Sequence, residues 1–111
     1  MNHSNQEFAL LDHLLLEAKK DDTRLYEMSM TYIYLMASSN IEFLEEYQPK
    51  IIDVINHWRG SLKTANALYY LVNGYSLFFL TKPVEGLKEL QQSFKYCDDT
   101  DLFKTSSADF S

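Results

Sequence analysis

The segment that most constrains the fold is residues 67–80, with the sequence Ala-Leu-Tyr-Tyr-Leu-Val-Asn-Gly-Tyr-Ser-Leu-Phe-Phe-Leu, which is apolar on nearly every side. A helix of this length spans about 20 Å, which is too short to cross a hydrocarbon layer of about 30 Å. An apolar helix in water must be covered all round. We therefore expect this segment to be the central helix of a small helical protein, covered by its neighbours or by a partner.

Composition restricts the classes of protein that fit. The chain has 111 residues, a length typical of one domain, and 46% of them are hydrophobic, which is enough for a folded core. Only three Gly and two Pro are present, which argues against a β architecture with its frequent turns. The formal net charge of −6 repels phosphate backbones, so we expect no nucleic-acid partner. No apolar run reaches about 18 residues, so we expect no membrane span.

The sequence contains no constellation typical of catalysis or metal binding. His3, His13 and His57 lack the spacing of metal ligands, and Cys97 is the only cysteine. A lone cysteine cannot form an internal disulfide, and the N-terminal residues lack the pattern of a signal peptide. We therefore expect a cytoplasmic protein that is not an enzyme and holds no metal or cofactor.

Hydrophobic periodicity predicts an all-α fold of about five helices. The expected helices are residues 7–18, a second that follows a cap at 21–23 and ends near 37, residues 41–58, residues 62–80 and residues 83–97. Pro49 is expected to kink or break the third helix, leaving residues 50–58 as a separate helical piece. The β-branched residues in 51–55 leave open a strand at that place instead.

The helices are expected to form one domain over residues 1–97, followed by an acidic, flexible tail over residues 98–111. Within the domain, residues 60–61 (Gly-Ser) are expected to end one helix and cap the next. The tail contains three large apolar residues, which leave open an anchored last helix: Leu102, Phe103 and Phe110.

Small residues in the last two expected helices have an informative spacing. Gly74 lies in the middle of a helix, where glycine costs about 1 kcal/mol relative to alanine. Such a residue is best explained by another backbone that passes close to it. Gly86 and Ser93 lie two turns apart on one face of the following helix, so a bulky neighbour can pack against both.

This hairpin resembles a tetratricopeptide repeat, in which two antiparallel helices carry small residues at fixed positions. The small residues that match are Gly74, Gly86 and Ser93, and the large packing residues are Tyr70, Leu77 and Leu90. Asn73 stands where the family usually has leucine, and Asp98 stands where a proline often closes the repeat. The resemblance implies a fold of tetratricopeptide-like antiparallel helical hairpins.

The match covers about one repeat, and a degenerate earlier copy is expected over residues 24–48 with an insertion over residues 49–61. An unrelated helical bundle is the alternative. Because isolated repeats need more units to bury their faces, so short an array predicts a partner that completes the core.

In this family, the first helix of each repeat lines a concave binding surface. The corresponding positions here are all large and apolar: Leu68, Leu71, Tyr75 and Phe78. An apolar groove of this kind suits an amphipathic helix. The alternative is that the N-terminal helix or the tail of this same chain fills the groove.

The order of the elements is similar to that of the co-chaperone that holds the needle subunit in bacterial type III secretion. This resemblance implies that the groove holds an amphipathic helix of the secreted subunit and keeps that subunit from polymerising. It also implies that a second small chaperone covers another face, with the N-terminal helix as the contact. The alternative function is an acidic immunity protein or antitoxin that blocks a basic toxin with Glu42, Glu45 and Glu46.

Overall fold

The structure is a computed structural model that describes residues 3–38 and 41–97, with side chains described in 8–38 and 44–96. The helices are α1 (His3–Lys20), α2 (Leu25–Ser38), α3 (Ile41–Arg59), α4 (Lys63–Ser76) and α5 (Pro83–Cys97). A 3-10 turn, η1 (Asp22–Arg24), precedes α2, and a π-helical turn, η2 (Leu77–Thr81), follows α4. The described residues contain no strand, so the prediction of an all-α fold with about five helices is confirmed.

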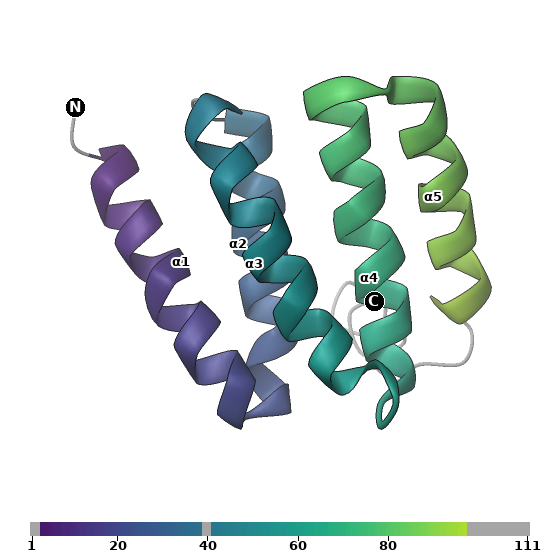
Figure 1. The fold of residues 1–111 in the computed structure, drawn as a ribbon, viewed down its shortest axis with the longest axis horizontal. Coiled ribbons are helices and arrows are strands. Elements are labelled where there is room, and N and C mark those ends of the chain that lie inside the picture. The colour runs from purple at the N-terminus through teal and green to yellow at the C-terminus, as the bar shows by residue number, and fades with distance from the viewer. Residues whose placement is uncertain (1–2, 39–40, 98–111) are drawn as a thin grey trace, which may run out of the picture.

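The helices stand side by side in a row from α1 to α5, with α2 behind α3 (Figure 1). Short connections make consecutive helices run in alternating directions, so α2 and α4 run parallel to each other. Helix α4 contacts α2, α3 and α5, which covers much of its apolar surface. The predicted central segment thus lies between three other helices.

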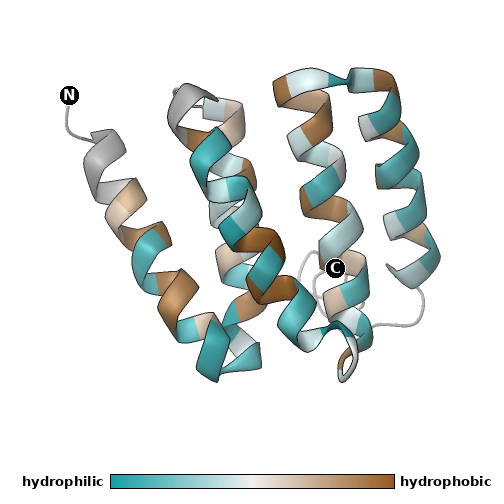
Figure 2. Cartoon of the chain, viewed as in Figure 1, coloured by the Kyte–Doolittle hydropathy of each residue, from teal (hydrophilic) through white to brown (hydrophobic). Residues whose placement is uncertain are grey.

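The core is formed where the helices face one another, and hydrophobic and hydrophilic residues alternate along the helices (Figure 2). Helices α1 to α4 contribute its buried side chains, among which the largest are Tyr32, Leu11, Leu14, Leu25, Met28, Leu35, Met36, Leu44, Ile51, Ile55 and Leu68. Tyr32 donates a hydrogen bond to the carbonyl of Leu44 and accepts one from Ser76, each at 3.4 Å. These bonds provide partners for a hydroxyl group in an otherwise apolar interior.

The break expected at Pro49 is wrong, because α3 continues through this residue from Ile41 to Arg59. The strand expected as an alternative for residues 51–55 is also absent, since these residues are helical. Pro49 and Glu45 are both exposed, so water can solvate the Glu45 carbonyl that proline leaves without its usual amide donor. The helix tolerates proline here because the lost hydrogen bond faces solvent.

Two helix ends differ from the sequence expectation. Helix α1 begins at His3, four residues before the expected start. The position before α4 is taken by Leu62, which makes no side-chain capping bond, so the expected cap at Ser61 is wrong. Instead, the amides of Ser61 and Leu62 both donate to the carbonyl of Trp58 and close the α3–α4 turn.

The predicted tail over residues 98–111 lies outside the described residues.

The helix expected over residues 62–80 changes character near its end. The amide of Lys82 donates to the carbonyl of Leu77 at 2.7 Å, a bond that spans five residues and widens the last turn. Pro83 then occupies the first position of α5, as predicted, where its missing amide is not needed. The connection from α4 to α5 is therefore short and tightly constrained.

Candidate protein-binding surface

Glycines set the distance between α4 and α5. A Cβ atom on Gly74 would lie 2.8 Å from Cγ of Leu90 and 2.9 Å from its amide nitrogen. A Cβ atom on Gly86 would lie 2.6 Å from both the Gly74 carbonyl oxygen and the Phe78 nitrogen. Real Cβ atoms do not approach other atoms so closely, so both sites require glycine at this helix separation. The close backbone approach inferred from the mid-helix glycine is present at Gly74.

Of the other residues predicted to pack this hairpin, Ser93 and Tyr70 lie at or beside the same contact, whereas Leu77 faces α3. Ser93 is buried and its hydroxyl donates to the carbonyl of Leu90 at 2.6 Å. The ring of Tyr70 stacks on Tyr96 of α5 with 5.6 Å between centroids. Leu77 is half-buried and lines a hollow between α3 and α4.

Asn73, which departs from the repeat pattern, has a partner across the hairpin. Its side-chain amide donates to the carboxylate of Glu89 on α5 at 2.7 Å. This bond joins α4 to α5 through polar side chains.

The four residues predicted to bind a partner differ in exposure. Leu68 is only 1% exposed and belongs to the core, so its side chain cannot be a principal contact surface. Leu71 and Tyr75 are half-buried and pack against that core. Phe78 is 39% exposed and packs edge-on against Phe79. Leu71, Tyr75 and Phe78 recur at helical spacing, and we call these three residues the α4 stripe.

A shallow depression of about 220 Å³ lies where the start of α2 approaches the start of α4. It is lined by Asp22, Thr23, Leu25, Tyr26, Leu62, Thr64 and Leu68. Tyr26 is 37% exposed, whereas Leu68 contributes to the depression from the core. Tyr26 had not been identified from the sequence, although its aromatic character and helical spacing from Met30 and Ile33 are visible there.

Helix α5 exposes a second apolar surface. Val84, Leu87 and Phe94 are 63%, 50% and 65% exposed, and they recur on one side of the helix. Leu90 of the same helix packs over Gly74, whereas these three residues are exposed. We call Val84, Leu87 and Phe94 the outer face of α5.

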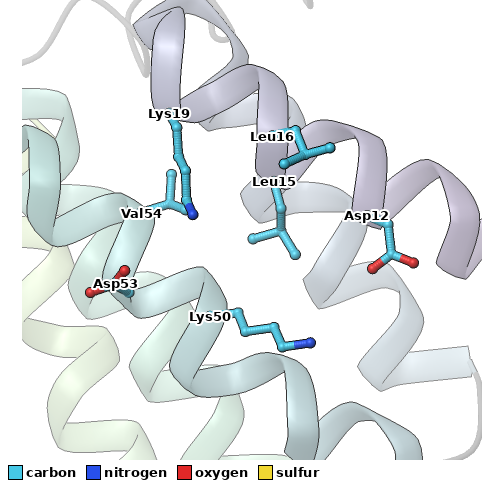
Figure 3. Close-up of a pocket in the computed structure, with 7 residues that line it drawn as sticks. All are labelled: Asp12, Leu15, Leu16, Lys19, Lys50, Asp53 and Val54. Carbon is cyan, nitrogen blue, oxygen red and sulfur yellow. The ribbon is translucent and has the colours of Figure 1, made fainter.

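A third surface is the cleft of about 350 Å³ between α1 and α3 (Figure 3). Leu15 points from α1 toward α3, beside Leu16 and Val54, and the charged lining residues are Asp12, Lys19, Lys50 and Asp53. Leu16 is 61% exposed and adds an apolar side chain to the rim of this cleft. Sequence reasoning named α1 as a contact for a second protein but did not identify this cleft.

The contact between α1 and α3 also contains a pair of stacked aromatic rings. Tyr47 of α3 stacks on Phe8 of α1 with 5.4 Å between ring centroids. Burial of the hydroxyl, with a hydrogen bond to Asp12, raises the pKa of Tyr47 to about 12. At neutral pH this tyrosine is an uncharged donor to the Asp12 carboxylate.

The described part of the chain contains no group of three His, Cys, Asp or Glu side chains that could hold a metal ion. Among the helices in residues 3–38 and 41–97, none is long and apolar enough to span a bilayer. Comparisons of the chain with protein-family models, with curated proteins and with solved structures found no match. The candidate binding features of the described helices are therefore three apolar surfaces: the α4 stripe, the outer face of α5 and the cleft between α1 and α3.

Proposed function

We propose that this protein is a non-enzymatic chaperone that binds an amphipathic helix of a type III secretion needle subunit in the cytoplasm and prevents that subunit from polymerising. The observation that carries the proposal is the α4 stripe, whose residues Leu71, Tyr75 and Phe78 remain partly exposed in the middle of the helical row. Surfaces of this kind take up the apolar side of an amphipathic helix through residues spaced three and four apart. Leu68, the fourth residue predicted for this surface, lies in the core and is not part of the α4 stripe.

The proposed groove is the concave surface of two tetratricopeptide-like hairpins, α2–α3 and α4–α5. Two observations support this assignment. Helix α4 packs against both α2 and α3, as the first helix of a second repeat would. The small residues Gly74, Gly86 and Ser93 lie in the contact between α4 and α5, where the repeat family also has small residues. Parallel α2 and α4 then form the two walls of the groove, with the depression at Tyr26 at one end.

The second small chaperone is proposed to bind the cleft between α1 and α3. This cleft combines an exposed leucine, Leu16, with charges of both signs at its rim, which suits a partly polar protein contact. It lies on α1 and α3, whereas the α4 stripe belongs to α4 and η2, so each surface has its own residues. One chain can thus contribute to a complex with two different partners.

The test is copurification of the full chain with the needle subunit of the same cell after coexpression. The variant Phe78→Asp places a charge on the exposed part of the α4 stripe, and we expect it to reduce the recovered complex by about tenfold or more, because burying an unpaired charge is costly. Leu10→Asp is the matched control, because Leu10 is 45% exposed on α1 and lies on neither wall of the proposed groove. We expect this control to recover the complex normally.

Two outcomes would contradict the proposal. The first is that no complex forms with the needle subunit. The second is that Phe78→Asp and Leu10→Asp behave alike while a double reversal, Glu45→Lys with Glu46→Lys, abolishes binding of a basic protein. That result would favour the acidic inhibitor, because both glutamates are exposed on α3.

A further inference from the structure

Helix α1 has an exposed stripe with an acidic residue at one end and a basic residue at the other. Asp12, Leu16 and Lys19 are all exposed, and their spacing of four and then three residues places them on one side of the helix. Leu16, in the middle, is 61% exposed. Lys20 adds a second exposed positive charge beside Lys19. We call Asp12, Leu16 and Lys19 the α1 stripe.

The charges of the α1 stripe are not neutralised by those of α3 across the cleft. In the part of the chain that the structure describes, no ion pair within 4 Å joins any two of the four charged lining residues, Asp12, Lys19, Lys50 and Asp53 (Figure 3). Asp12 accepts a hydrogen bond from the hydroxyl of Tyr47, and Lys50 lies 5.3 Å from the centre of the Tyr47 ring. A carboxylate can accept several bonds, so both ends of the stripe can still pair with another molecule.

The α1 stripe is complementary to a second copy of itself. When two α1 helices lie antiparallel about a twofold axis that passes between Leu15 and Leu16, residue 12 of each copy lies opposite residue 19 of the other. Asp12 then faces Lys19 of the second copy, and the symmetry forms this contact twice. The two Leu16 side chains meet beside the axis and exclude water from each other. Charge and apolar contacts therefore agree in one arrangement.

Other pairings of the same helices fit less well. A parallel pair of α1 helices would place Asp12 over Asp12 and Lys19 over Lys19. Packing α1 on α3 of the second copy would mismatch the spacing, because Asp12 and Lys19 are about 10.5 Å apart along the helix axis whereas Lys50 and Asp53 are about 4.5 Å apart. The antiparallel pair of α1 helices has neither fault, since each spacing is matched to itself.

The charge of the whole chain does not prevent this approach. The formal net charge is −6, which opposes the association of two copies. The four charged residues that line the cleft are two acids and two bases, however, so this surface has no net charge. Charges elsewhere on the chain are screened over about 8 Å at physiological salt.

We propose that this protein forms a twofold homodimer in which the α1 stripes of two copies pack antiparallel beside the α1–α3 cleft. The same region is proposed above for the second small chaperone, which would therefore replace the second copy. The inference concerns the chain alone and involves no residue of the α4 stripe, so it stands or falls separately from binding of a needle subunit.

The experiment is sedimentation equilibrium of the purified full-length chain over a wide range of protein concentration. We expect a reversible equilibrium between monomer and dimer. Lys19→Glu brings a carboxylate against Asp12 of the second copy, so we expect the dissociation constant of the dimer to rise about tenfold or more. Asp12→Lys should have a similar effect, because it brings like positive charges together. Circular dichroism checks that both variants are folded.

The decisive measurement mixes these two variants. A copy with Lys19→Glu has acidic residues at positions 12 and 19, and a copy with Asp12→Lys has basic residues at both. Opposite charges therefore face each other throughout the mixed dimer, and we expect the mixture to associate about as tightly as the natural chain. A purely structural effect of either substitution would not be reversed by mixing.

The matched control is Lys88→Glu, which makes the same change of charge at an exposed position on α5. We expect its dissociation constant to stay within about twofold of the natural value, because distant charges are screened. A natural chain that is monomeric at every concentration, or a mixture that remains monomeric, would overturn the proposal. A dimer that Lys19→Glu does not weaken more than Lys88→Glu does would also overturn it and would place the contact on another surface.

Discussion

At the scale of single residues, the strictest requirement in this protein is for glycine at position 86. The space for its missing side chain is filled by main-chain atoms of Gly74 and Phe78, which cannot rotate away. At Gly74, by contrast, two of the three nearest atoms belong to the side chain of Leu90. Neither glycine has a positive φ, so the requirement arises from packing and not from backbone conformation.

We expect Gly86→Ala to lower the free energy of unfolding by about 1–3 kcal/mol, because the added methyl group must push α5 away from α4. Urea unfolding followed by circular dichroism measures the change. Gly60→Ala is the control, since nothing lies within 4 Å of the position its Cβ would take. If Gly86→Ala and Gly60→Ala were equally stable, α4 and α5 would separate without loss of stability, which would contradict this prediction.

At the scale of helices, α1 is held by a side chain from the far end of α3. The indole nitrogen of Trp58 donates to the carbonyl of Ala18 at 2.7 Å, and Ala18 lies in the last turn of α1. Carbonyl groups in the last turn lack amide partners from their own helix, so this bond satisfies one of them. Trp58 is therefore half-buried, and its indole links α3 to the last turn of α1.

We expect Trp58→Phe to cost about 1 kcal/mol of stability, because a buried aromatic contact remains while the hydrogen bond to Ala18 is lost. The loss of stability should be largest near Ala18, in addition to the decrease for the whole molecule. Amide hydrogen exchange at the end of α1 should accelerate more than exchange in α5, since α5 takes no part in the Trp58–Ala18 hydrogen bond. Uniform acceleration in both helices would contradict the local role of the indole.

The helices also show which features a sequence can predict. Their number and most of their bounds follow from hydrophobic spacing, because each helix has an apolar side toward the core. The continuity of α3 could not be predicted, since it depends on Pro49 facing solvent. The exposures of Leu68 and Phe78 could not be predicted either, because a helix that is apolar all round has no polar side to orient it.

At the scale of the whole molecule, the interior contains ionisable groups whose charged forms oppose folding. Burial raises the pKa of Tyr32 to about 12, although its bond from Ser76 acts in the opposite direction. Burial and Asp12 raise the pKa of Tyr47 to about 12 as well. Unfolded tyrosine ionises near pH 10, so between about pH 10 and 12 the unfolded state loses protons that the folded state retains.

We expect the free energy of unfolding to fall as pH rises from about 10 to 12, because ionisation favours the unfolded chain in this range. Tyr47→Phe removes one of the two groups, and its stability should fall less steeply with pH than that of the natural chain. Tyr34→Phe, at an exposed position, should match the natural chain. Urea unfolding at several alkaline pH values tests this, and identical slopes for all three proteins would contradict it.

The π-helical turn η2 holds one residue more than an ordinary α-helical turn, since the bond from Lys82 to Leu77 spans five residues. Removing one residue between them, such as the exposed Thr81, would leave an ordinary bond that spans four residues, so α5 could start from nearly the same place. Gly86 would then remain against the backbone of Phe78. A single deletion in this turn should therefore be tolerated better than a deletion between Pro83 and Gly86, which would move a residue with a side chain into the contact.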